Sequence, residues 1–325
     1  MTSQADSPDP ESSPSKVDLL ILGAGWTSTF LIPLLKAQKI SYAATTTTGR
    51  DGTYKFKFAP DTDPQEDAAQ YRALPSAQTV LITFPLKGAA ETTTLYESYV
   101  HIHGHASASK KPEFNFIQLG STGLWTIPGQ DPWVTRHSRY DTSNARGQAE
   151  DELLRRGGCV LDLAGLWGGQ RNAIHWIDRV ASTKEMLRGK GSLHMVHGVD
   201  VARAVIAVHQ QFKKAQGERF MLTDLQVYDW WSLILGFAGE LDVQNGNAER
   251  AGKQIKWIGE LMEEQGVRAL PRDMETLGRC YDTREFWSTF GIMPTRSRIS
   301  SVVIGGQWGQ LPREGTRGST MRIIK

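Results

Sequence analysis

A short glycine-rich stretch, residues 23–28, has the residue types and spacing best suited to chemistry in this chain. It reads G-A-G-W-T-S, follows the apolar run at 17–22 directly and opens a helix-like segment at 30–35. A strand, a tight glycine turn and a helix in this order predict a dinucleotide site, because backbone amides at the helix start can face a pyrophosphate. The alternative is an ordinary turn. The predicted cofactor contacts are Gly23, Gly25, Trp26, Thr27 and Ser28, the last standing where a third glycine is usual.

The end of the second predicted strand, residues 41–46, indicates which dinucleotide binds. NAD sites usually carry an acidic residue there, which holds the ribose hydroxyls. Here residues 45–50 read T-T-T-T-G-R, with no acid before Asp51. An arginine offers a charged fork to a 2′-phosphate, so Thr46 and Arg50 favour NADP(H) over NAD(H). The alternative is a solvated loop. Phe84 and Pro85, at the end of another predicted strand, complete the cofactor contacts.

A second candidate stretch, residues 119–125, reads L-G-S-T-G-L-W and follows the predicted strand at 114–119. Small hydroxyl residues at the carboxyl end of a central strand lie where a nicotinamide and a substrate would meet. We therefore select Ser121 to hydrogen-bond a substrate carbonyl or hydroxyl, and Trp125 to flank the substrate. The local alternative is a capped turn.

The elements that must position these residues alternate between strand-like and helix-like from Val17 to about Asp224. This rhythm predicts an α/β fold, a Rossmann doubly wound and mainly parallel sheet with a small helical substrate lobe. Asp200 is the expected N-cap of a helix at 200–212. Strands are predicted at 17–22, 41–46, 54–58, 79–84, 114–119, 159–163 and 219–222. The NAD(P)-binding domain takes residues 17–171 plus 196–225, and the lobe takes 172–195 plus 226–294.

Composition excludes several classes of protein. The net charge of +2 gives no reason to expect a nucleic acid or an anionic membrane as partner, and no apolar run approaches the ~20 residues of a membrane span. Two cysteines cannot build a disulfide framework, so we expect a reduced, cytoplasmic protein. Residues 1–16 lack the apolar core of a secretory signal and predict a disordered tail. Residues 295–325 form a basic, poorly ordered tail, with nucleic-acid contact as the alternative.

Histidines alternate at 101, 103 and 105, a pattern that a metal site can use. Neither a cysteine nor an acidic cluster accompanies them in the sequence. We therefore predict no metal site.

A succession of motifs resembles the short-chain dehydrogenase/reductase superfamily, in particular an atypical subgroup of its extended, epimerase/dehydratase-like branch. The resemblance covers roughly residues 17–231. It implies a Rossmann fold, a nicotinamide dinucleotide and an oxidoreductase, epimerase or dehydratase acting on a hydroxyl or carbonyl small molecule. The motifs are L-G-A-G-W at 22–26, G-S-T-G-L-W at 120–125, A-E-D-E-L-L at 149–154, L-D-L-A-G-L-W-G-G-Q-R at 161–171, H-G-V-D-V-A-R-A at 197–204 and G-E-R-F-M-L at 217–222.

The catalytic residues of that family carry over only in part. The family uses a Ser or Thr, a Tyr and, four residues later, a Lys. The resemblance puts Ser121 in the serine role, Thr142 at the tyrosine position and Arg146 at the lysine position. Arg146 can hold the nicotinamide ribose, but a threonine is too weak an acid or base for hydride chemistry near neutral pH. Tyr140 and bound water are the candidate proton donors.

Two functions from different classes therefore stay open. The serine and the lobe motifs favour an enzyme, whereas the missing tyrosine and lysine favour a dinucleotide-binding protein that senses redox state without catalysis. Arg171, where the lobe begins, is selected to hold an anionic or hydroxylated substrate, with a surface salt bridge as the alternative. The sequence makes no prediction of oligomeric state.

Overall fold

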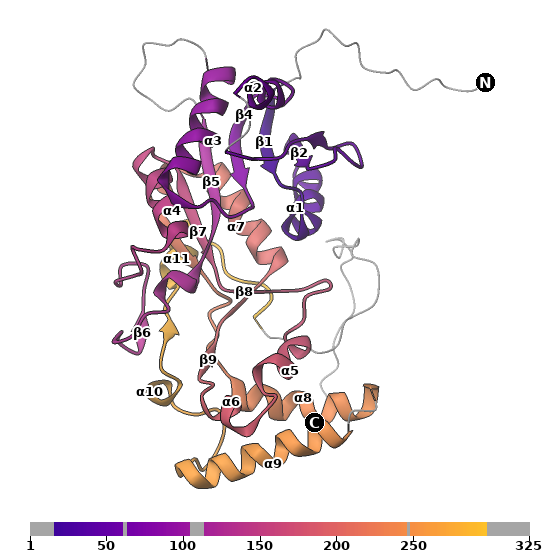
Figure 1. Cartoon of the computed structure of the whole chain (residues 1–325), viewed down its shortest axis with the longest axis vertical. Helices are drawn as coiled ribbons and strands as arrows, with labels where there is room; N and C mark the ends of the chain where they lie inside the picture. Colours follow the sequence, from indigo (N-terminus) through magenta and orange to yellow (C-terminus); the bar gives the residue numbers. More distant parts are fainter. Residues whose placement is uncertain (1–15, 61–63, 105–113, 246–247, 298–325) are drawn as a thin grey trace, which may run out of the picture.

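A seven-stranded parallel sheet forms the centre of the computed structural model, which describes residues 16–60, 64–104, 114–245 and 248–297 (Figure 1). Its strand order, β3-β2-β1-β4-β5-β7-β11, is that of a doubly wound fold and confirms the predicted class. His105 and most of the two predicted tails lie outside the described residues. Of the tails, only Lys16 and residues 295–297 are described. The strands are β1 (Val17–Leu22), β2 (Tyr42–Thr46), β3 (Tyr54–Lys55), β4 (Ala77–Ile82), β5 (Asn115–Ser121), β7 (Cys159–Leu163) and β11 (Arg219–Leu222).

Helices cover both faces of the sheet because the strands are apolar on both sides. Along β1, Leu19 and Ile21 join one hydrophobic cluster while Leu20 and Leu22 join another, as the two-residue period of a strand requires. The first cluster contains side chains of α1 (Trp26–Ala37) and α7 (Gly198–Gln210). The second contains side chains of α2 (Pro64–Arg72), α3 (Gly88–His103) and α4 (Ala145–Arg155).

The strand order reverses between β1 and β4. β1 pairs with β2 on one side and with β4 on the other, and each chain crossing leaves from the carboxyl end of its strand. In open sheets of this kind, ligands bind outside the carboxyl ends of the strands at this switch point. The fold therefore brings the glycine stretch to the expected edge.

A helical lobe lies beyond the sheet, in the lower part of Figure 1. Its helices are α5 (Ile177–Val180), α6 (Lys184–Arg188), α8 (Trp230–Asn245), α9 (Ala248–Gln265) and the short α10 (Met274–Leu277). Four of its helices, α5, α6, α8 and α9, share a third hydrophobic cluster, in which Trp231 is fully buried. The guanidinium of Arg272 stacks 3.9 Å from the Trp231 ring centroid and forms an ion pair with buried Asp229, just before α8.

The domain division itself stays a prediction, but one helix inside the predicted lobe range packs elsewhere. The side chains of α11 (Arg284–Phe290) join the hydrophobic cluster on the α1 and α7 face of the sheet. Phe286 and Phe290 each meet Phe220 of β11 edge to face. The chain thus returns from the lobe to the sheet.

Three short strand pairs link the sheet to the lobe, and the sequence did not predict them. They are too short to carry a hydrophobic period. β8 (Gly165–Trp167) pairs with β10 (Met195–His197), β9 (Ser192–Leu193) pairs with β12 (Tyr228–Asp229), and β6 (Trp133–Val134) pairs with β13 (Cys280–Tyr281).

The predicted helix cap at Asp200 is wrong. His197 caps α7, its Nδ1 accepting a hydrogen bond from Val199 N at 3.1 Å, and Asp200 lies within the first turn. The Asp200 carboxylate accepts bonds from the backbone amides of Thr295 and Arg296 instead. The Asp200 carboxylate thus binds a segment distant in the sequence, whereas the local sequence pattern predicted that it would cap the helix.

None of the helices within the described ranges combines the length and the apolar character needed to cross a bilayer.

Asp224, two residues after β11, is a fully buried carboxyl group. It accepts hydrogen bonds from Gln226 N at 3.2 Å and from the Tyr228 hydroxyl at 2.5 Å. Burial raises the pKa of Asp224 from 3.8 to about 7. Because the folded-state pKa is the higher one, the stability that the bound proton contributes is complete below pH 3.8 and is lost as pH rises through about 7.

Asp224→Asn should therefore flatten the pH dependence of stability. Between pH 5 and 8 the wild type should lose about 2–3 kcal/mol of unfolding free energy relative to the variant. The Asn amide can donate to the Tyr228 hydroxyl, whose single proton is then available to Ser297 O at 2.9 Å, so Tyr228 stays hydrogen-bonded. Urea unfolding at several pH values measures the difference. Parallel curves for the two proteins would contradict it.

Candidate functional site

The turn after β1 is built for glycine. Gly23 has a φ of +91°, and a Cβ there would stand 2.7 Å from Thr83 Oγ1. Thr83 donates to Gly23 O at 2.6 Å, and Thr45 Oγ1 accepts from Gly23 N at 2.9 Å. Hydroxyl groups from the ends of β4 and β2 therefore fix the turn on both sides.

The helix that follows begins without a side-chain cap. Gly25 is its N-cap, the first turn contains no acidic residue, and a Cβ at Gly25 would meet nothing within 4 Å. Uncapped amides and the positive end of the helix dipole attract an anion, and the missing side chain leaves room for it. The residues present therefore fit a pyrophosphate. Thr27 and Ser28 are buried in the same turn.

Trp26 joins this turn to a distant loop. Its Nε1 donates to Gly168 O at 3.1 Å, and the guanidinium of Arg171 lies 4.6 Å from its ring centroid. The Trp26 ring also meets Phe30 edge to face. Phe30 meets His197, and His197 meets Trp167, in the same way. A chain of four rings thus runs from the start of α1 to the end of β8.

The predicted contacts at the ends of β2 and β4 lie on the same edge of the sheet. Thr46 Oγ1 accepts from the amides of Gly49 and Arg50 and so shapes the loop. The Arg50 side chain is 69% exposed, and its ion pair with Asp51 is long, at 3.9 Å. Phe84 is half-buried beside Gly23, and Pro85 is exposed.

Ser121 is the last residue of β5 and is held through its backbone. Its amide donates to Asp162 Oδ1 at 2.7 Å, while its hydroxyl accepts from Gly123 N at 3.2 Å. The capped turn that was the local alternative is therefore present. Accepting that bond leaves the hydroxyl proton of Ser121 able to serve a substrate oxygen.

A buried charge network lies beneath Ser121, and the sequence did not predict it. Arg219 Nε lies 3.2 Å from Asp162 Oδ2, and its Nη2 lies 3.2 Å from Glu150 Oε2. A Cβ at Gly120 would stand 2.1 Å from Asp162 Oδ1, so only glycine fits between the carboxyl groups. Burial and the neighbouring carboxyl of Glu150 raise the pKa of Asp162 well above its usual range. A lone acid inside the apolar run C-V-L-D-L was the available signal, because a buried charge needs a partner.

The two other predicted catalytic residues are tied into this network. Arg146 donates to Leu119 O at 2.9 Å and to Glu150 at 3.2 Å. Tyr140 donates to Asp151 at 2.7 Å, and the Arg219 guanidinium lies 4.5 Å from its ring centroid. Burial and the bond to Asp151 raise the pKa of Tyr140. Its hydroxyl is therefore less ready to give up a proton than a free tyrosine.

Trp125, predicted to flank the substrate, is instead fully buried. Its Nε1 donates to Ser138 O at 3.0 Å, and its ring packs against Tyr140. The loop after Trp125 folds back over it, which leaves no surface for a ligand. Arg171, the other predicted substrate contact, is exposed.

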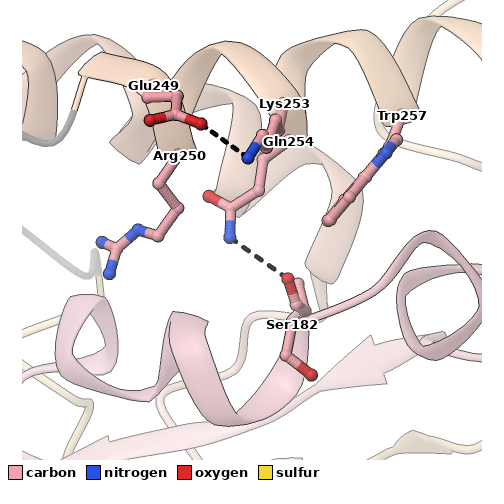
Figure 2. Close-up of a pocket in the computed structure, with 7 residues that line it drawn as sticks. Ser182, Glu249, Arg250, Lys253, Gln254 and Trp257 are labelled. Carbon is pink, nitrogen blue, oxygen red and sulfur yellow. Dashed lines mark hydrogen bonds and ion pairs between the residues drawn. The ribbon is translucent and has the colours of Figure 1, made fainter.

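Two surface hollows lie away from all of these residues. One, of about 400 Å³, lies in the lobe between α9 and residues 181–182, where Gln254 Nε2 donates to Ala181 O at 3.2 Å (Figure 2). The other, of about 690 Å³, lies between α2 and α3. Over the described ranges, no three His, Cys, Asp or Glu side chains are grouped to hold a metal ion.

Neither a protein-family model nor a curated protein matches this chain. Solved structures do. Vestitone reductase from alfalfa (Medicago sativa) superposes with a TM-score of 0.57 at 15% identity, over 87% of this chain and 95% of that one.

Two further structures are similar over comparable lengths. dTDP-glucose 4,6-dehydratase from Bacillus anthracis, in complex with NAD, has a TM-score of 0.52 at 12% identity, over 86% of this chain and 92% of that one. Yeast methylglyoxal/isovaleraldehyde reductase, complexed with NADPH, has a TM-score of 0.50 at 11% identity, over 86% and 94%. The chain therefore has the same Rossmann fold as these proteins, the fold that its motifs implied.

Proposed function

We propose that this chain binds NADP(H) at the carboxyl edge of β1, β2 and β4 and acts as an oxidoreductase, or as an epimerase or dehydratase, on a small hydroxyl or carbonyl compound. The observation that carries the proposal is the uncapped start of α1 behind a turn that requires Gly23. A nicotinamide dinucleotide supplies hydride transfer when bound.

The choice of NADP(H) rests on Arg50. Its guanidinium is exposed beside the end of β2, where an acidic residue would serve the ribose of NAD. The similar structures include one with NAD and one with NADPH, so they are consistent with either cofactor.

In the enzyme, Ser121 orients the substrate oxygen with its hydroxyl proton. Arg146, in the first turn of α4, reaches Leu119 O of β5 with its guanidinium and holds the nicotinamide ribose. The proton comes from Tyr140 or from water, and Tyr140 has to exchange its bond to Asp151 before it can donate to a substrate.

That same bond favours a second candidate function. With Tyr140 bonded to Asp151 and Arg146 occupied by Leu119 O and Glu150, the candidate proton donor and the residue at the lysine position are both engaged inside the protein. A protein that binds the dinucleotide and reports its redox state, without transferring hydride, needs neither a free proton donor nor a free cation at these positions.

Gly25→Ala tests cofactor binding directly. The added Cβ meets no protein atom and the φ of −98° suits alanine, so stability should not fall. The methyl would occupy the approach of the pyrophosphate and weaken NADPH at least about tenfold, or 1.4 kcal/mol. Fluorescence titration measures the affinity, and Gly259→Ala, also without close neighbours, is the matched control. Unchanged affinity in the Gly25 variant, or a wild type that binds neither NADPH nor NADH, would refute the site.

Arg50→Ala tests the cofactor form. Because only NADP carries the 2′-phosphate, the variant should lose roughly 10-fold or more in NADPH affinity and little in NADH affinity. Equal losses for both cofactors would remove the assignment.

Ser121→Ala and Tyr140→Phe separate the two functions. In a screen of aldehydes and ketones that monitors NADPH oxidation, an enzyme should show turnover in the wild type. Ser121→Ala should lower that turnover by about 10²-fold while NADPH affinity is kept. A Tyr140→Phe loss identifies the proton donor, and an unaffected Tyr140→Phe points to water. NADPH binding with no oxidation of any compound in the screen would favour the sensor.

A further inference from the structure

A tight turn at residues 168–171 lies against the proposed cofactor site. Gly168 N donates to Arg171 O at 2.8 Å, and Arg171 N donates back to Gly168 O at 3.1 Å. Gly168 and Gly169 have φ values of +108° and +58°, and a Cβ at Gly168 would stand 2.3 Å from His197 Nε2. The turn therefore has a defined backbone conformation and packs directly against His197.

The first turn of α1 holds this turn in place through one side chain. Trp26 donates its Nε1 proton to Gly168 O, and its ring supports the Arg171 guanidinium at 4.6 Å. Trp26 is the residue directly after Gly25, the N-cap. Arg171 is thus positioned beside the helix start by the same element that presents the amides.

Arg171 has no carboxylate partner in the described part of the chain, although it is oriented and exposed. A cation fixed next to the positive end of a helix is unfavourable without an anion. Two buried donors nearby in the chain also lack an acceptor among the described residues. These are Ser28 Oγ, in the same helical turn, and Trp167 Nε1, just before the turn.

We propose that the Arg171 guanidinium binds the diphosphate bridge of the dinucleotide, with Trp26 as its positioning residue. This inference rests on the proposed function and replaces the substrate role predicted for Arg171. The guanidinium offers paired donors to phosphate oxygens, in addition to the amides of the α1 start. The diphosphate is common to NADP and NAD, so Arg171 contributes affinity without selecting between them.

The test compares dissociation constants for NADPH, NADH and ADP-ribose in the wild type, Arg171→Gln and Arg171→Lys. Arg171→Gln should weaken all three at least tenfold and by similar factors, and should reduce the salt dependence of binding. Arg171→Lys, which keeps the charge without the fork, should lie between. Arg179→Gln, which removes an exposed arginine from α5, is the control and should change none of them.

Trp26→Leu tests the positioning role. It removes the stacking surface and the bond to Gly168 O, so alone it should weaken the three ligands. Combined with Arg171→Gln it should add little, because both changes remove the same contact. Full additivity would contradict the role of Trp26.

The outcomes are distinguishable. If the wild type binds the dinucleotides and Arg171→Gln binds them equally well, the inference is overturned while the proposed function stands. A raised KM for a carbonyl substrate with unchanged cofactor affinity would return Arg171 to the substrate. No binding by the wild type would overturn both.

Discussion

The buried ion pair between Asp162 and Arg219 is the interaction on which the carboxyl edge of the sheet depends. Asp162, near the end of β7, reaches sideways to the Ser121 amide on β5, and Arg219 comes from β11 on the other side. Three strands are thus joined by side chains as well as by their backbone ladder, which runs on past Asp162 to Leu163. Removing Arg219 would leave two buried carboxyl groups without their shared cation, a change that typically costs about 3–5 kcal/mol. The position of Ser121 therefore depends on a charge it does not touch.

Arg146, which the motif resemblance puts at a lysine position, limits what this edge can do with protons. A guanidinium stays charged at every accessible pH, and here it bonds to Leu119 O and Glu150. Tyr140 lies against a different cation, Arg219, and donates to Asp151. The site thus contains two arginines, but their guanidinium groups pair with the protein's own carboxyl groups.

The sheet was predictable because its signals are local and long. The apolar run at β1 alternates between two faces, and every predicted strand corresponds to an observed one, with end shifts of up to three residues. Hydrogen-bond partners that lie far apart in the sequence were not predictable. Asp200 accepts from residues 295 and 296, and Trp26 donates to Gly168, 142 residues away. Trp125 was misplaced for a related reason, since the course of the loop that buries it has no sequence signature.

The row of rings from Trp26 through Phe30 and His197 to Trp167 makes the cofactor side and the lobe side one mechanical unit. Phe30 lies so close to Gly198 that a Cβ there would stand 2.3 Å from its ring, so a residue larger than glycine would push against the row. Burial lowers the pKa of His197 to about 4, which keeps its imidazole neutral in ordinary cellular conditions. A side chain at position 198, or the loss of Phe30 or His197, would thus break the one line of ring contacts described between the first helix and the strand that leads into the lobe.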